Sequence, residues 1–357
     1  NIEINDYLWP AQWGSKRVGL AEAWRQLEAL DLQAKDVVIA LIDTGMNFNH
    51  EDLQNRLWYN PGEIPGNGRD DDGNGFIDDV NGYNFVDNNA NPYDDSGHGT
   101  MNAGLMVANL NSFGIAGAAG HNTKIKVMVV KALTGEGGFK SDAINSINYA
   151  MAMGAEVSSN CWGGPGESVA LKFAIQTAME HGHLFVAAAG NEAQDADGWG
   201  FYPCVYPHVF CVAATAQGDQ LAHFTNYGVQ TVQIAAPGHE IVSSYYLDTQ
   251  YGTLSGTSFG CSLTAGAAAL IWSWLGHQEI SSLRQVEDVR WLLIDSAERT
   301  AWTDNLVTSG LLDVAAAVQH AISDVRSSWQ LGPWGACRWP TCTPEATGFM
   351  TRTVSCV

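Results

Sequence analysis

The sequence VVIALIDTG, residues 37–45, is a short apolar run that ends in turn-forming residues. The runs KIKVMVVKAL (124–133) and HLFVAAAGN (183–191) have the same character. Helical patterns lie between and beside them, in SDAINSINYAMAMG (141–154), which carries an N-cap serine and a glycine stop, and in SVALKFAIQTAMEHG (168–182). This alternation predicts an α/β fold, a doubly wound and mainly parallel sheet with helices on both faces.

The sequence predicts two domains, with the boundary in the later part of the chain. VEDVRWLLIDSAERT (286–300) and GLLDVAAAVQHAI (310–322) read as terminal helices. After Arg326 the chain becomes rich in Trp, Cys, Gly and Pro and shows no amphipathic period. We therefore expect a large domain over residues 1–326 and a small disulfide-type segment over residues 327–357.

Charge and composition limit the function classes. Thirty-eight acidic residues against 17 basic ones give a net charge of -21, which excludes nucleic acid as an expected partner. Eight aspartates lie between Asp70 and Asp95, so cation binding is the expected use of part of this charge. No uninterrupted apolar run reaches about 18 residues, which predicts no membrane span. The chain opens without a signal peptide, and we expect upstream targeting segments to have been removed.

Cysteine usage favours an oxidising compartment. Three of the seven cysteines crowd into the last 21 residues, at Cys337, Cys342 and Cys356. Cys204 and Cys211 flank VYPHVF, at a spacing that allows a bridge. We expect a secreted protein or one of the secretory pathway.

The stretch LSGTSFGCSLTAGAAAL, residues 254–270, places Ser258 at the start of a helix built from small residues. The free N–H groups and positive dipole end of a helix start favour a nucleophilic serine whose own N–H binds an oxyanion. The alternative is an ordinary serine or threonine cap on a buried helix.

Three further motifs supply the partners that such a serine needs. DDSGHGT puts His98 between two glycines before another helix of small residues. Asp43 and Asn191 each end an apolar run, where the carboxyl ends of parallel strands gather side chains at one edge of the sheet. Taken alone, the aspartate could simply form a turn and the histidine could have a structural role.

The ordered set IDTG, GHGT, AAAGN and SGTS closely resembles the subtilisin-like serine proteases, and the likeness extends over nearly all of residues 1–326. The resemblance implies a serine endopeptidase in which Ser258 is the nucleophile, His98 the general base and then acid, and Asp43 the group that orients His98. It also implies an oxyanion hole made by Asn191 and the Ser258 N–H. Phe259-Gly260 and Ser262-Leu263 depart from the common family residues, but none of them is a member of the triad, so we expect activity to survive.

The resemblance also implies how substrate binds. The peptide is laid as a strand between LTGEGGF (133–139) and CWGG (161–164), whose glycines allow close approach. Because both segments are mainly apolar, we expect a hydrophobic residue at P1, the residue on the acyl side of the cleaved bond. The predicted substrate-binding residues are Gly137, Gly138, Cys161, Trp162, Gly163 and Glu192.

Calcium is the predicted cofactor. NGRDDDGNGFIDDVNG (67–82) is nearly an EF-hand loop but lacks its twelfth-position glutamate, and the alternative is a solvated acidic loop. Its candidate ligands are Asp70, Asp72, Asn74, Phe76, Asp78 and Asp79. The resemblance implies a second site in ANLNSFGIAG (108–117), where main-chain oxygens and one amide would join two distant carboxylates. The candidate ligands of this second site are Asp6, Asp52, Asn109, Asn111, Phe113 and Ile115.

The last segment resembles the first half of a thrombospondin type 1 repeat, with the matching residues Trp329, Trp334, Cys337, Cys342, Gly348, Arg352 and Cys356. Such repeats imply binding to a glycan or receptor, and the alternative is an inert linker. The family likeness further implies a zymogen whose inhibitory propeptide is removed, and protein or peptide substrates. Two other functions stay open: a peptide ligase or cyclising transpeptidase using the same triad, and an adhesion protein with an inert protease scaffold.

Overall fold

The computed structural model describes residues 2–30, 33–122, 124–275 and 282–329. Within these ranges nine strands form one sheet, in the order β11-β8-β6-β5-β4-β1-β3-β2, with β7 on the edge of β6. All pairings are parallel except that of β7 with β6. The strands are β1 (Val37–Asp43), β2 (Gly82–Asn84), β3 (Ile125–Lys131), β4 (Val157–Asn160), β5 (Leu184–Ala188), β6 (Phe210–Ala216), β7 (Gln220–Leu221), β8 (Ile234–Pro237) and β11 (Gly310–Leu311).

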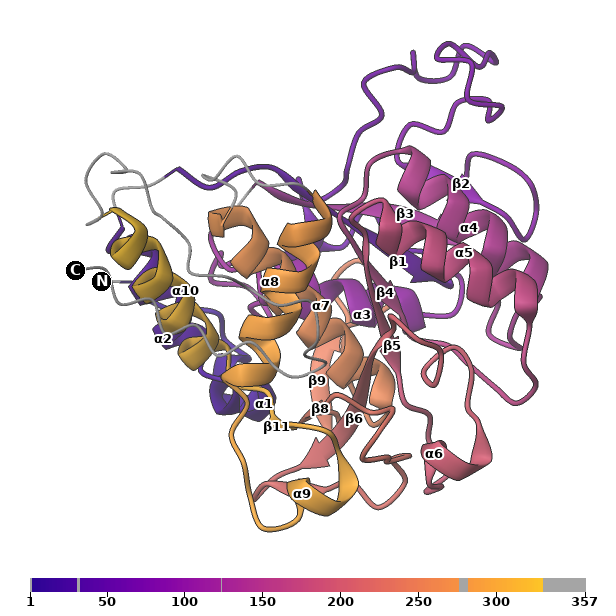
Figure 1. The fold of residues 1–357 in the computed structure, drawn as a ribbon. Helices are drawn as coiled ribbons and strands as arrows, with labels where there is room; N and C mark the ends of the chain where they lie inside the picture. The colour runs from indigo at the N-terminus through magenta and orange to yellow at the C-terminus, as the bar shows by residue number, and fades with distance from the viewer. Residues whose placement is uncertain (1, 31–32, 123, 276–281, 330–357) are drawn as a thin grey trace, which may run out of the picture. The chain divides into compact units, whose positions relative to one another are not determined.

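Helices cover both faces of this sheet, as predicted (Figure 1). One face carries α3 (His98–Val107) and the long α7 (Thr257–Leu275), which runs across β1 and β3 to β8. The other face carries α4 (Lys140–Ala152) and α5 (Val169–Glu180), which pack on each other. Alternate residues of each strand therefore enter different cores, so that Ala40 and Ile42 join the cluster under α4 and α5.

The remaining elements are peripheral. A two-stranded antiparallel ribbon pairs β9 (Ile241–Ser244) with β10 (Tyr251–Leu254), and β9 packs against α3. The other helices are η1 (Trp9–Ala11), α1 (Trp13–Arg17), α2 (Leu20–Glu28), η2 (Glu51–Leu53), α6 (Ala196–Trp199), α8 (Ser282–Asp295), α9 (Thr303–Leu306) and α10 (Val314–Trp329). Among the described residues, no helix combines the length and the apolar character that crossing a membrane requires.

Two local predictions need correction. Ser141 does not cap α4, because that helix begins at Lys140 after the extended Phe139, and the Ser141 hydroxyl donates to Asp142 instead. Gly310 and Leu311, expected in a helix, form the short strand β11 against β8. Ser168 does cap α5, accepting from the Leu171 N–H, and Gly154 and Gly182 have positive φ where α4 and α5 end.

The chain divides into a compact unit over residues 1–321 and a second unit over residues 322–357. Of the second unit, the structure describes only the end of α10. The thrombospondin-like residues from Trp334 onward lie outside the described residues. The boundary at residue 326, the disulfide character of this segment and its glycan or receptor partner therefore stay predictions.

Candidate active site

The sheet reverses its direction of winding at β1, and the polar residues of interest lie at that point. The chain runs from β1 to β3 on one side and later returns to β4 on the other side of β1. In open α/β sheets this switch point leaves a crevice outside the carboxyl ends of the strands. Asp43 is the last residue of β1, and Cys161 follows β4 directly.

Asp43 and His98 are hydrogen-bonded at this end of the sheet. The Nδ1–H of His98 donates to Oδ1 of Asp43 over 2.7 Å, and the aspartate is fully buried. The Thr44 N–H donates to the same oxygen, and Nδ2 of Asn102 donates to the other at 3.0 Å. Since Nδ1 is used by the carboxylate, Nε2 of the ring is free to exchange a proton with a substrate or a nucleophile.

The charge of Asp43 controls the protonation of His98. Burial disfavours the charged ring, but the nearby Asp43 carboxylate and its hydrogen bond outweigh that cost and raise the pKa of His98 to about 9. Burial also raises the pKa of the Cys161 thiol, so that this neighbour is uncharged near neutral pH. The carboxylate of Asp43 is thus the principal charge acting on the ring.

The loop before His98 is held by a buried aspartate that sequence reasoning missed. Asp94 accepts hydrogen bonds from the N–H groups of Ser96, Gly97 and Thr100 and from the hydroxyls of Thr44 and Thr100.

A Cβ on Gly99 would lie 2.0 Å from the carbonyl oxygen of Gly45, so only glycine allows α3 to start this close to β1. Asn102 was also missed, although its position one helical turn after His98 could have indicated it.

Ser258 is the second residue of α7, and only 7% of its surface is exposed. Its hydroxyl donates to the Cys161 carbonyl over 3.4 Å, and among the described residues no hydrogen bond joins it to the His98 ring. The His98 ring nevertheless lies beside the same helical turn, 6.3 Å from the ring of Phe259 between centroids. A change of the Ser258 χ1 rotamer is the motion that would redirect its hydroxyl.

Hydrogen bonds to the side-chain oxygen of Asn191 fix the orientation of its amide and leave the amide nitrogen available as a donor. Its side-chain oxygen accepts from the N–H and the hydroxyl of Thr257, at 2.9 and 3.1 Å. Its Nδ2 has no partner within the described part of the chain. The contact with Thr257 therefore fixes the amide with its NH₂ end available as a donor, next to Ser258.

The predicted substrate-binding residues lie in three segments of the chain. Cys161, Trp162 and Gly163 follow β4, and neither main-chain polar group of Trp162 has a hydrogen-bond partner among the described residues. Gly137 closes a tight turn with Thr134, and Gly138 lies against the Ala132 carbonyl. The side chain of Glu192 is held by Asn226, whose Nδ2 donates a hydrogen bond to Oε2 of Glu192 over 2.7 Å.

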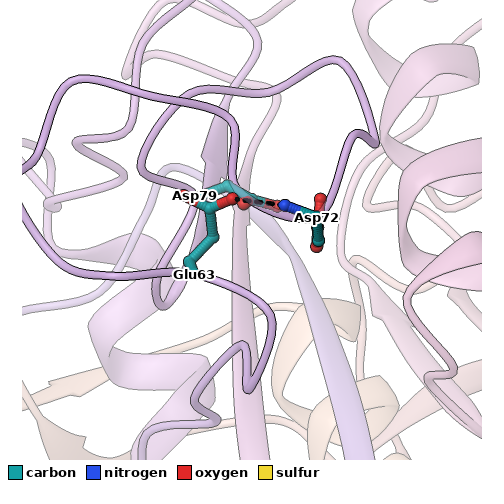
Figure 2. Close-up of side chains that lie close together, drawn as sticks. All are labelled: Glu63, Asp72 and Asp79. Atoms are coloured by element: carbon teal, nitrogen blue, oxygen red, sulfur yellow. Dashed lines mark hydrogen bonds between the residues drawn. The ribbon is translucent and has the colours of Figure 1, made fainter.

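The acidic loop holds a cluster that differs from the predicted one. Carboxylate oxygens of Glu63, Asp72 and Asp79 lie within 4.8 Å of one another (Figure 2). Asp70 and Asp78 are not members of this cluster; Asp70 accepts from the amides of residues 73–75, and Asp78 accepts from those of residues 67 and 68. Asn74 bridges Asp72 and Asp79 through its side-chain amide, and Phe76 packs on Tyr83. Glu63 was missed because it precedes the aspartate-rich run.

The second predicted calcium site contains buried oxygens without partners. Oδ2 of Asp6 and Oδ1 of Asp52 are buried and accept no hydrogen bond. Their other oxygens accept from the N–H groups of Asn111 and Ile115. Among the described residues, no donor reaches the carbonyl oxygens of Asn109, Phe113 and Ile115. Burial raises the pKa of both aspartates.

Comparison with known proteins agrees with this geometry. Residues 34–316 match the model of the Subtilase family (Peptidase_S8). The chain is 32% identical to thermitase of Thermoactinomyces vulgaris, covering 88% of this chain and 98% of thermitase. It is 33% identical to the major intracellular serine protease of Bacillus subtilis (strain 168), over 73% of this chain and 75% of that protein. It is also 32% identical to subtilisin of Bacillus pumilus, over 80% of this chain and 91% of that protein.

The chain therefore belongs to the subtilase family. It is a serine endopeptidase with the α/β fold of subtilisin.

Proposed function

We propose that this chain is a secreted, calcium-stabilised endopeptidase that hydrolyses peptide bonds through an acyl-enzyme on Ser258. The observation that carries the proposal is the 2.7 Å hydrogen bond between Asp43 and His98 at the switch point of the sheet, where α7 with Ser258 also begins. Asp43 holds the imidazole in the tautomer that leaves Nε2 unprotonated and stabilises the imidazolium that forms during the reaction.

The proposed reaction proceeds in two halves. The Ser258 oxygen attacks the scissile carbonyl carbon while its proton passes to Nε2 of His98. His98 then gives this proton to the departing amine as the C–N bond breaks, which leaves an ester on Ser258. Water attacks the ester, again with His98 as base, and the carboxylic acid leaves as the Ser258 hydroxyl re-forms.

The negative oxygen of each tetrahedral intermediate needs fixed donors. The Ser258 N–H lies at the start of α7, where backbone N–H groups have no intrahelical acceptor. Nδ2 of Asn191 is the second proposed donor, held by the bonds of its oxygen to Thr257. Such preorganised donors act on the transition state without reorientation.

Replacing Asn191 with alanine is expected to lower kcat by about 10²–10³-fold with little change in KM, because the donor acts on the oxyanion more than on bound substrate. That range is the one known for the oxyanion asparagine of subtilisin. Steady-state kinetics on a defined peptide measure it. Gln194→Ala, which changes a nearby exposed amide, should stay within a few-fold of the unchanged chain. A large rise in KM at constant kcat would contradict the oxyanion role.

Product masses test hydrolysis directly. A defined peptide incubated with the enzyme should yield two fragments whose summed mass exceeds that of the peptide by one water. A ligase or transpeptidase would instead transfer the acyl group to an added amine. If joined or cyclic products predominated, the hydrolytic proposal would fail.

Calcium is proposed at two places. Asp6, Asp52 and the side chain of Asn111 would hold one ion, together with the free carbonyl oxygens of Asn109, Phe113 and Ile115. Glu63, Asp72 and Asp79 would hold the other, with Asn74 adjacent to two of them. Bound calcium would supply positive charge beside these carboxylates, all of which except Asp72 are buried, and it would tie distant segments of the chain together.

Removal of calcium is expected to lower the melting temperature by about 5 °C or more, since a ligand at 100 times its Kd stabilises a fold by about 2.7 kcal/mol. The measurement is best made on the Ser258→Ala protein, because self-digestion cannot then distort the unfolding curve. Asp52→Asn and Asp79→Asn should each reduce the shift caused by EDTA. Asp36→Asn, which alters an exposed carboxylate, should not. An unchanged melting temperature in excess EDTA would contradict both sites.

The proposal of secretion rests on the cysteines. Cys204 and Cys211 form a disulfide, which persists in oxidising compartments. The removal of an inhibitory propeptide remains a prediction that accompanies this proposal.

A further inference from the structure

Two neighbouring strands diverge beside Ser258. β4 and β5 pair in parallel up to Asn160 and Ala187. Beyond that point residues 161–164 and 189–191 leave the edge of the sheet as two separate walls, one starting at Cys161 and the other ending at Asn191. A scissile carbonyl held between Ser258 and Asn191 is bonded directly to the Cα of the P1 residue. The P1 side chain must therefore enter the space between these two walls.

The ring of Phe201 already fills that space. A Cβ on Gly163, in the first wall, would lie 2.3 Å from Cε1 and 2.7 Å from Cζ of Phe201. A Cβ on Gly190, in the second wall, would lie 2.9 Å from the same Cζ atom. One edge of the ring thus lies against the backbone of both walls. The ring itself requires glycine at position 163, whereas at Gly190 the positive φ of 101° and the side chains of Asn226 and Glu192 also require it.

The ring is held firmly in this place. Phe201 is 6% exposed and belongs to the core cluster under α4 and α5. Trp199 stacks on it, with the ring planes 20° apart and the centroids 6.0 Å apart. The next residue, Tyr202, exchanges two main-chain hydrogen bonds with Gly164, at 2.8 and 2.9 Å. The segment that carries the ring is therefore joined to one wall, and close packing resists its displacement.

We propose that Phe201 is a specificity-determining residue that closes the P1 crevice and restricts P1 to small side chains such as those of Gly, Ala and Ser. This inference rests on the proposed function, because it assumes that Ser258 and Asn191 hold the scissile carbonyl. The apolar character of the walls alone favours a large hydrophobic P1 residue, but the space for one is taken by the protein's own ring.

The nearby carboxylate does not change this conclusion. The Glu192 carboxylate accepts a hydrogen bond from Asn226 beside the second wall, and its Oε2 would lie 2.6 Å from a Cβ on Gly190. A basic P1 residue would find this charge attractive, but its long aliphatic stem needs the volume that the Phe201 ring occupies. Lysine and arginine are therefore expected to be excluded with phenylalanine and leucine.

The test compares peptides that differ only at P1, with Ala, Leu, Phe or Lys, using enzyme whose active concentration is set by titration with a fluorophosphonate. The unchanged chain should cleave after Ala with a kcat/KM at least about tenfold above that for Phe. Phe201→Ala should raise kcat/KM for the Phe peptide about 10- to 100-fold and leave the Ala peptide within a few-fold. Phe201→Val, a milder change, should shift the same ratio in the same direction if the alanine variant does not fold.

Phe173→Ala is the matched control, since Phe173 is 68% exposed on α5 and should leave the order of the P1 residues unaltered. Cleavage after Phe or Lys as fast as after Ala in the unchanged chain would overturn the assignment of Phe201. A P1 order that stayed the same in a folded Phe201 variant would do so as well. Either result would leave the proposed hydrolysis intact, whereas absence of cleavage of all four peptides, with no labelling of Ser258, would overturn both.

Discussion

Replacing Ser258 with alanine is expected to lower kcat for peptide hydrolysis by about 10⁶-fold. The hydroxyl oxygen is the proposed nucleophile, and the neighbouring Cys161 thiol cannot substitute for it because burial raises the pKa of that thiol and keeps it protonated. This magnitude is the one established for subtilisin, a member of the same family. The residual rate, measured at high enzyme concentration, would reflect binding and the oxyanion donors alone.

His98→Ala should cause a loss of similar size, and the double variant should be scarcely worse than either single variant. Residues that act as one unit show this lack of additivity. Ser141→Ala, which removes an exposed hydroxyl from α4, is the control and should retain full activity. Losses that multiplied in the double variant would show that Ser258 and His98 act independently, against the account given above.

Asp43→Asn is expected to lower kcat by about 10⁴-fold and also to change the pH profile. The general base must be unprotonated, and the Asp43 carboxylate raises the pKa of His98 to about 9. In the unchanged chain kcat/KM should therefore rise with pH up to about that value. Without the carboxylate the largest contribution that raises the pKa of His98 is lost while burial still lowers it, so the acidic limb of the variant should move to lower pH.

The pH profile separates a positioning role from a merely structural one. Asp36→Asn should keep both the rate and the acidic limb of the unchanged chain. The pair should also affect stability: a His98 pKa raised above its usual 6.5 stabilises the fold below pH 6.5, and this part is lost as the pH rises through about 9. An Asp43→Asn profile with an unmoved acidic limb would contradict the proposed coupling.

The sheet was predictable because its central strands are buried on both faces. Such strands are continuous apolar runs, and the runs over residues 37–45 and 183–191 contain β1 and β5. The end of each run also showed where a side chain would project, which is why Asp43 could be proposed before its partner was seen. β11 could not be predicted, since two residues carry no pattern of their own and are strands only because β8 lies beside them.

The parts of the site that sequence reasoning missed depend on contacts between distant segments. Glu63 lies outside the aspartate-rich loop and joins Asp72 and Asp79 only through the folding of the chain around them (Figure 2). Phe201 belongs to an apolar run of no special character, and its role follows from glycines about 10 and 40 positions away in the sequence that meet its ring. Motif order can identify the chemistry of a family, but the volume left for a substrate side chain is a property of packing.

The central claim is that Ser258 is a nucleophile activated by His98 and Asp43, and its most direct test is covalent labelling. The calcium-loaded protein is treated with a fluorophosphonate, digested and analysed by mass spectrometry. The expected result is one adduct, on the peptide that contains Ser258, which is absent from Ser258→Ala and strongly slowed in His98→Ala. An unlabelled Ser258 in the folded protein, or peptide cleavage that persists in Ser258→Ala, would contradict the claim.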